Sequence, residues 1–129
     1  MGMYTELVLK CRVSKTVPDD VKRVINYLFN GGEKPIFSPE HAFFECDRWS
    51  HIGKSSSYYH HPQPLNDYHD VDYSNEIYIF SRSDLKNYDD EISKFINWVT
   101  PYIDGSGDGS QCIGWSWYEE DDKPTLIVI

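Results

Sequence analysis

The stretch TELVLKCRVSKTVPDDVKRVINYL, Thr5–Leu28, is followed about seventy positions later by a similar one, NEIYIFSRSDLKNYDDEISKFINWV, Asn75–Val99. Each stretch begins with residues that alternate between apolar and polar, which is the period of a half-buried strand. Each then passes through a polar turn into apolar residues at helical spacing: Val21, Val24, Ile25 and Leu28 in the first, and Ile92, Phe95, Ile96 and Val99 in the second. The sequence therefore predicts two strand–helix units that share one sheet.

Local signals predict where the two helices begin and end. The first helix starts near Pro18–Asp20, because proline fits a first helical turn and carboxylates favour the positive helix end, and it stops at Asn30–Gly32. The second helix is predicted over about Tyr88–Tyr102, with Asn87 as its cap and Pro101 near its end.

The remaining segments complete the predicted sheet. Further strands are expected at about His41–Trp49, Cys112–Glu119 and Thr125–Ile129, whereas residues 50–74 read as a long loop with room for a short strand at Ser57–His60. The order strand, helix, strand, strand, helix, strand, plus one C-terminal strand, predicts an α+β fold of the ferredoxin-like, split βαβ type. We expect residues 1–129 to form a single domain, with an antiparallel sheet that carries both helices on one face.

Composition narrows the functions that the chain can perform. Its 129 residues carry a net charge of −9, which disfavours binding to nucleic acids and to anionic membranes. No apolar run is long enough to span a membrane. Three cysteines are an odd number, and no secretory signal segment opens the chain, so we expect a cytoplasmic protein with reduced thiols. No nucleotide- or phosphate-binding fingerprint is present, and no cofactor is expected.

A second feature of the predicted sheet is an aromatic face that no helix covers. Neighbouring residues of a strand point to opposite faces, so Tyr78 and Phe80 should lie opposite the helices if Ile77 and Ile79 face them. The offset of about seventy residues puts Phe43, Glu45, Asp47, Ile113, Trp115 and Trp117 on the same outer face, although a one-residue slip would exchange the two faces. The predicted binding surface comprises Tyr78, Phe80, Trp115, Trp117, Trp49, Arg12 and Arg82.

The long loop offers an alternative chemistry. Imidazole and carboxylate groups gather between His60 and Asp72, and both are ligands for divalent transition metals. The spacing fits no known ligand pattern, and no nucleophile or orienting partner accompanies these groups. The candidate metal ligands are His60, His61, His69, Asp67 and Asp70.

These patterns favour a small, acidic, non-enzymatic binding or accessory protein. Exposed aromatic side chains would anchor a protein partner, and the negative charge would steer the chain toward a basic surface. A second copy of the chain is the other expected occupant of the aromatic face, giving a homodimer. The alternative is a metal-dependent or small-molecule enzyme or sensor that uses the segment His60–Asp72.

Overall fold

The fold is known from a computed structural model that describes residues 3–57 and 61–129. The elements, in chain order, are β1 (Thr5–Ser14), α1 (Asp19–Asn30), the 3-10 helices η1 (Ala42–Glu45) and η2 (Trp49–His51), β2 (Leu65–Val71), β3 (Glu76–Leu85), α2 (Glu91–Val99), the 3-10 helix η3 (Thr100–Tyr102), β4 (Cys112–Tyr118) and β5 (Thr125–Val128). Two helices and one open sheet confirm the predicted α+β class.

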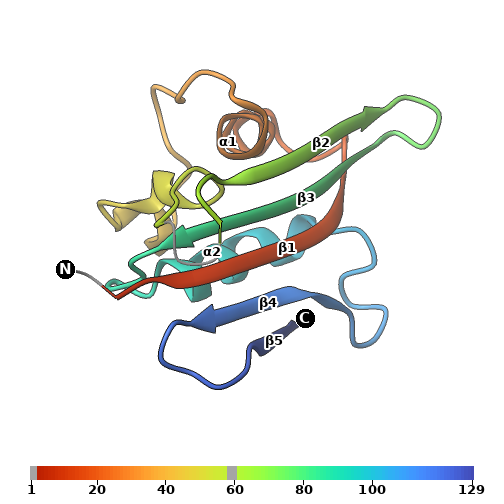
Figure 1. Ribbon diagram of the computed structural model, residues 1–129. Helices are drawn as coiled ribbons and strands as arrows, with labels where there is room; N and C mark the ends of the chain where they lie inside the picture. The colour runs from red at the N-terminus through yellow and green to blue at the C-terminus, as the bar shows by residue number, and fades with distance from the viewer. Residues whose placement is uncertain (1–2, 58–60) are drawn as a thin grey trace.

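The sheet has the order β2-β3-β1-β4-β5, and all neighbouring strands are antiparallel (Figure 1). The two strands of the repeated stretches, β1 and β3, lie side by side in the middle, as predicted, and pair along their whole length from Thr5↔Leu85 to Ser14↔Glu76. Each of these central strands is followed in sequence by a turn and then a helix. The two longest strands are thus the centre of the sheet, and each leads into one of the two helices.

Both helices pack on one side of this sheet, as the repeated pattern predicts. The rings of Phe29 on α1 and Phe95 on α2 lie 6.0 Å apart between centroids, so the two helices share one apolar layer. Leu9 and Val13 of β1 and Ile77 of β3 belong to the same core and are nearly inaccessible to solvent. In Figure 1, α2 crosses behind the central strands.

The ends of the helices follow the sequence signals. Gly31 adopts φ 71° at the end of α1, a left-handed conformation that glycine reaches without strain. The residue at the N-cap position of α2 is Asp90 and not the predicted Asn87, but the side chain of Asn87 accepts a hydrogen bond from the amide of Ile92 at 2.9 Å and so satisfies one amide of the first turn. α2 is shorter than predicted at both ends. It begins at Glu91 and not at Tyr88, because Asp90 is left-handed at φ 58°, and its last turn tightens into η3 at Thr100–Tyr102, where Pro101 cannot continue an α-helix.

The strand predicted at His41–Trp49 is wrong, because this segment forms η1 and η2 instead. Its buried residues are Phe43, Cys46, Trp49 and Ile52, which recur every third position. A repeat of three is the period of a 3-10 helix, in which residues i and i+3 lie above one another. The aromatic side chains of this segment therefore fill the core beside α2 and do not add an edge to the sheet.

The edge strand next to β3 comes from the segment predicted to be a loop. β2, Leu65–Val71, pairs with Arg82–Glu76 of β3, and most of its residues are exposed. The short strand considered at Ser57–His60 lies outside the described residues except for Ser57, which is in no strand. The edge strand next to β3 is therefore formed by Leu65–Val71 and not by the predicted segment His41–Trp49.

No helix in the described part of the chain combines the length and the apolar character needed to cross a bilayer.

Candidate functional site

The face of the sheet opposite the helices is the candidate site. Directly paired residues of an antiparallel sheet carry their side chains on the same side, so the pairing register identifies this face. Val8 pairs with Arg82 on one side and with Trp115 on the other, and Trp115 pairs in turn with Leu126. We call this surface the open face; it comprises Leu65, Asp67 and His69 of β2, Tyr78, Phe80 and Arg82 of β3, Glu6, Val8, Lys10 and Arg12 of β1, Trp115 and Trp117 of β4, and Leu126 and Val128 of β5.

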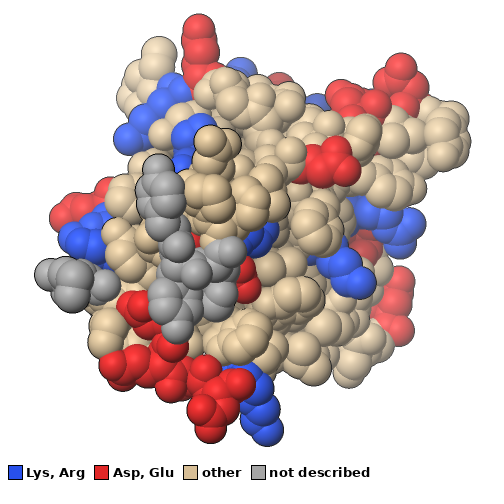
Figure 2. All heavy atoms as spheres, viewed as in Figure 1, with Lys and Arg blue, Asp and Glu red and all other residues tan. Residues whose placement is uncertain are grey.

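Large apolar side chains are exposed on the open face. Phe80 is 47% exposed, and Leu126 is 62% exposed. Tyr78, Trp115 and Trp117 are partly exposed. Figure 2 views this side of the molecule, where acidic side chains gather along the lower rim and at the upper right, around a centre made mostly of other residues. The open face therefore combines exposed apolar side chains with acidic residues at its border.

Trp115 and Trp117 lie on the predicted side of the sheet, but the start of β4 does not follow the predicted alternation. The β4–β5 register shifts between Cys112 and Gly114, which marks a bulge. Ile113, predicted to point outward, is fully buried, whereas Cys112 is exposed. One extra residue in the strand exchanges the two faces at this point, and the strand beyond the bulge resumes the expected order.

A buried ion cluster around Arg82 closes the end of the open face at which β1 begins and β3 ends. The guanidinium of Arg82 donates to Oε2 of Glu6 and to Oδ2 of Asp84, each at 2.7 Å. The carbonyl of His61 accepts a longer bond from Nη1 at 3.4 Å. The Arg82 side chain is only 7% exposed. Arg82 was predicted as part of the binding surface, and this is wrong, because its charge is satisfied inside the protein.

Trp49 is likewise not part of the binding surface that the sequence predicted. It is 6% exposed, and its ring packs edge-on against Phe44 at 5.0 Å and against Phe43 at 6.0 Å between centroids. Its place in η2 directs it into the core, since the threefold spacing of this segment aligns it with Phe43 and Cys46.

A groove lies at the other end of the open face, next to Arg12. Its volume is about 420 Å³, and it lies between the middle of β1 and β3 and the start of β4. The guanidinium of Arg12 lies 5.9 Å from the centroid of the Tyr78 ring. A hydrogen bond with Tyr78, followed by the charge of Glu76, raises the pKa of Arg12 above its usual value. The groove is lined by Lys10, Cys11, Arg12, Asp67, His69, Tyr78, Ile79, Phe80, Gln111 and Cys112.

The proposed metal ligands that lie among the described residues do not converge. Nε2 of His69 lies 2.6 Å from Oδ1 of Asp67, and both are on the open face. Asp70 is on the opposite side of β2, where it pairs with Lys15. His61 Nδ1 lies within hydrogen-bond distance of the Gln63 backbone, at 3.0 Å from its carbonyl. His60 lies outside the described residues. Among the described residues, no three His, Cys, Asp or Glu side chains are grouped to hold a metal.

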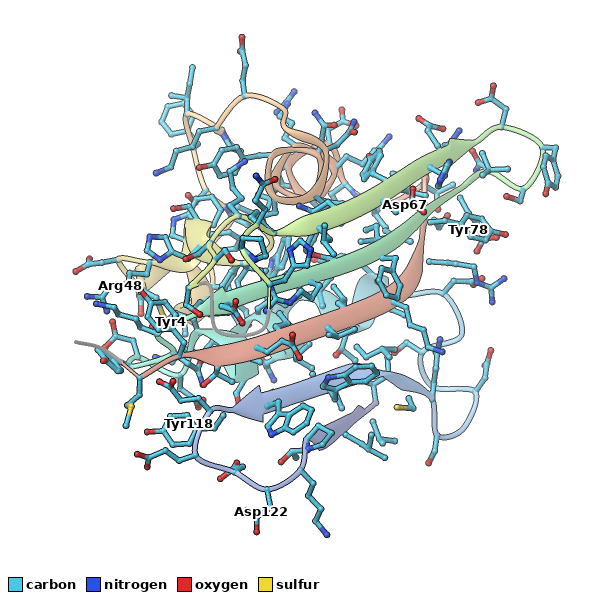
Figure 3. The ribbon with its side chains drawn as sticks, viewed as in Figure 1. Tyr4, Arg48, Asp67, Tyr78, Tyr118 and Asp122 are labelled. Atoms are coloured by element: carbon cyan, nitrogen blue, oxygen red, sulfur yellow. The ribbon has the colours of Figure 1, made fainter. Side chains whose placement is uncertain are left out.

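An acidic turn borders the open face where β4 ends. We use this term for Glu119–Asp122, of which Glu120, Asp121 and Asp122 are exposed. Figure 3 shows Asp122 at the tip of the turn and Tyr118 at its base. Trp117 donates from its indole nitrogen to the carbonyl of Asp121 at 2.9 Å, which fixes the turn against the aromatic surface.

The sequence alone locates much of this site but not the groove. Tyr78, Phe80, Trp115, Trp117 and Arg12 lie on one face, as the alternation predicts. Lys10 and Cys112 were not among the predicted binding residues. The alternation of β1 places Lys10 on the outer face, whereas the exposure of Cys112 depends on a bulge for which Gly114 is the only sequence signal.

Comparison of this chain with protein-family models, with curated proteins and with solved structures finds no match.

Proposed function

We propose that the protein is a non-enzymatic binding protein that docks a basic surface of another protein against the β4–β5 end of its open face. The observation that carries the proposal is the exposure of Leu126, which pairs with the partly exposed Trp115, on a sheet face that no helix of the described residues covers. Exposed apolar groups of this size within one face are typical of interaction surfaces. Trp115 and Trp117 add aromatic area, and tryptophan is enriched among the residues that dominate binding energy.

Charge supports a basic protein as the occupant over a second copy of the chain. The acidic turn lies beside Trp117, to which Asp121 is hydrogen-bonded. The whole chain carries a charge of −9, so two copies repel one another at long range. A basic partner would gain from the same field, both in its rate of association and in the orientation of docking.

The first test removes the apolar anchor without disturbing the core. Leu126→Asp changes a side chain that is 62% exposed, and its matched control, Ile36→Asp, changes one that is 92% exposed and lies away from the open face. Proteins retained by the immobilised wild type and by the control, but not by Leu126→Asp, are purified and titrated by calorimetry. We expect Leu126→Asp to weaken binding at least about tenfold, because the variant loses the apolar contact of leucine and must desolvate a carboxylate at the interface.

The second test examines the charge. The triple variant Glu120→Gln, Asp121→Asn, Asp122→Asn should slow association with the purified partner at low salt, and the difference should shrink as salt rises. A control that neutralises the exposed Glu33, Glu40 and Glu45 should have a smaller effect. Sedimentation that shows a wild-type dimer, converted to monomer by Leu126→Asp, would overturn the proposal in favour of a second copy. Equal binding by Leu126→Asp and Ile36→Asp would remove the open face as the docking site.

A further inference from the structure

Two cations and two aromatic rings form a compact array on the open face, where β1 and β3 border the groove. Lys10 pairs directly with Phe80, and Arg12 pairs directly with Tyr78, in the β1–β3 ladder. Directly opposed side chains in an antiparallel pair are neighbours, at about 4.5–5.5 Å between Cβ atoms. The array therefore places two positive groups along β1 beside two rings along β3, all on one side of the sheet.

The array borders a groove because β4 leaves β1 at this point. The β1–β4 ladder ends at Leu9↔Gly114, so Lys10 and the residues after it have no partner on β4. Gly114 permits this departure: its φ is 148°, and a Cβ there would lie 1.8 Å from the carbonyl oxygen of Val8. Gln111 and Cys112 stand across the opening and form the other wall of a groove of about 420 Å³. That volume falls within the range of small-molecule sites.

Of the two cations, Lys10 is available to a ligand, whereas Arg12 already interacts with Tyr78 and with two carboxylates. Lys10 is exposed, and its side chain makes no hydrogen bond or ion pair with any described residue. Arg12 is 48% exposed, and its nearest carboxylates, those of Asp104 and Glu76, lie at 3.7 and 4.0 Å, longer than a hydrogen-bonded ion pair. The carboxylate at the opposite wall belongs to Asp67 and is already paired with His69 at 2.6 Å. In Figure 3, Asp67 and Tyr78 lie on adjacent strands at this end of the face.

From this arrangement we infer that the groove binds a small organic anion with a flat aromatic body. Its carboxylate or comparable acidic group would lie between Lys10 and Arg12, and its ring would stack on Tyr78 and Phe80. Apolar walls with a few convergent polar groups are the usual composition of a small-molecule site. A long polyanion fits less well, because the acidic rim and the charge of −9 repel an extended phosphate chain.

This site is separate from the proposed protein-docking surface. The anion is held by Lys10 and its neighbours, whereas the docking surface depends on Leu126, Trp117 and the acidic turn. The two proposals can be tested independently, because the experiment on the groove uses a purified small molecule and contains no partner protein. Failure of one proposal therefore leaves the other unchanged.

The alkylation rate of Cys112 can show whether a ligand occupies the groove. Cys112 is exposed and lines the groove, whereas Cys11 and Cys46 are buried. The probe ligands are indole-3-acetate and its neutral counterpart indole-3-acetamide, which differ only in the acidic group. The rate of Cys112 alkylation by iodoacetamide is followed by intact mass as each probe is added, and the concentration that gives half-maximal protection is compared between variants.

We expect indole-3-acetate to protect Cys112 at a concentration at least about tenfold lower than the amide, because a charge-assisted contact is stronger than a neutral one. Lys10→Met should raise the protective concentration of the acid about tenfold and leave that of the amide unchanged. Lys123→Met, in the exposed β4–β5 turn, is the matched control and should behave as the wild type. Thermal melting verifies that each variant is folded.

Four results would overturn the inference. Absence of protection by either probe would remove the groove as a binding site. Equal protection by acid and amide, or protection by the acid that is insensitive to Lys10→Met, would reduce the groove to an apolar patch. Protection by a single-stranded RNA hexamer at a lower concentration than by indole-3-acetate, at physiological salt, would identify a nucleic acid as the occupant.

Discussion

Arg82 on β3 donates a hydrogen bond from Nε to Oε2 of Glu6 on β1 at 2.7 Å, and their side chains are only 7% and 11% exposed. Asp84 accepts from Nη2 of the same guanidinium at 2.7 Å, and its side chain is 1% exposed. Two carboxylates thus depend on one cation in a place that water hardly reaches. Removal of one member of a buried ion cluster leaves uncompensated charge, which costs far more than the loss of a surface pair.

Arg82→Met should therefore lower the free energy of unfolding by about 3–5 kcal/mol. Urea denaturation followed by tryptophan fluorescence measures the change. The control Arg23→Met alters an exposed side chain on α1 and should change stability by less than about 0.5 kcal/mol. If Arg82→Met proved as mild as the control, the cluster would not stabilise the closed end of the open face.

Gly114→Ala should destabilise the protein by at least about 2 kcal/mol. The added Cβ would lie 1.8 Å from the carbonyl oxygen of Val8, so either β4 or β1 must move. Gly107→Ala is the matched control, because its φ of 91° is also left-handed but a Cβ there meets nothing within 4 Å. We expect about 1–2 kcal/mol for the control, from backbone strain alone. Thermal and urea unfolding compare the two, and equal losses would argue against a tight β1–β4 contact.

The central part of the fold was predictable because its signals are local and periodic. Burial alternates along Leu9–Ser14 of β1 and Glu76–Ser81 of β3, although the other half of each strand is buried on both faces, and α1 carries proline at its start and glycine at its end. The outer face followed from the same alternation, which is why Tyr78, Phe80, Trp115 and Trp117 were placed on it.

The edge strand β2 could not be recognised from periodicity. Its sequence LNDYHDV has exposed residues on both faces, so it lacks the apolar alternation that marks a half-buried strand. Its partner β3 and the turn that joins them determine its place, and this is tertiary information.

The opposite error occurred at 41–49, where aromatic residues resemble a strand although their burial repeats every three positions. The threefold spacing of Phe43, Cys46 and Trp49 is visible in the sequence and indicates a 3-10 helix. The high strand propensity of the aromatic residues led to the prediction of a strand instead.

Asn87→Ala should cost about 1–2 kcal/mol of unfolding free energy. The substitution removes the acceptor for the Ile92 amide, and it also forces alanine into the left-handed conformation that Asn87 adopts at φ 49°. Asn87→Gly removes the acceptor but tolerates that φ, so it should cost less. Asn87→Asp retains the acceptor and should be nearly neutral. An alanine variant as stable as the aspartate variant would show that this hydrogen bond contributes nothing.

Lys15→Met should alter stability in a pH-dependent manner. Hydrogen bonding to Lys15 lowers the pKa of Asp72 below its usual value of 3.8. A lowered pKa in the folded state stabilises the protein above about pH 4 and ceases to do so as pH falls through the folded pKa. The difference in Tm between wild type and Lys15→Met should therefore shrink between pH 5 and about pH 2. It should be small throughout, because Asp72 is fully exposed. A difference that grew on acidification would contradict this assignment.

Iodoacetamide at pH 8 should modify one cysteine of the folded protein. Cys112 is exposed on the open face, whereas Cys11 and Cys46 are buried. Burial raises the pKa of Cys11 to about 12, so almost none of it is thiolate at this pH, and burial also raises the pKa of Cys46. The thiolate is the reactive form, and the core thiols are therefore doubly protected, by access and by protonation.

Intact mass should show a single adduct, which peptide mapping assigns to Cys112, and Cys112→Ser should show none over the same period. In urea, all three cysteines of the wild type should react, because unfolding exposes the core thiols and returns their pKa toward its usual value near 9. Fast modification of Cys11 without denaturant would mean that the gap between β1 and β4 opens into the core. The groove would then be a mobile opening, and it could not hold a ligand between Lys10 and Cys112 in one fixed geometry.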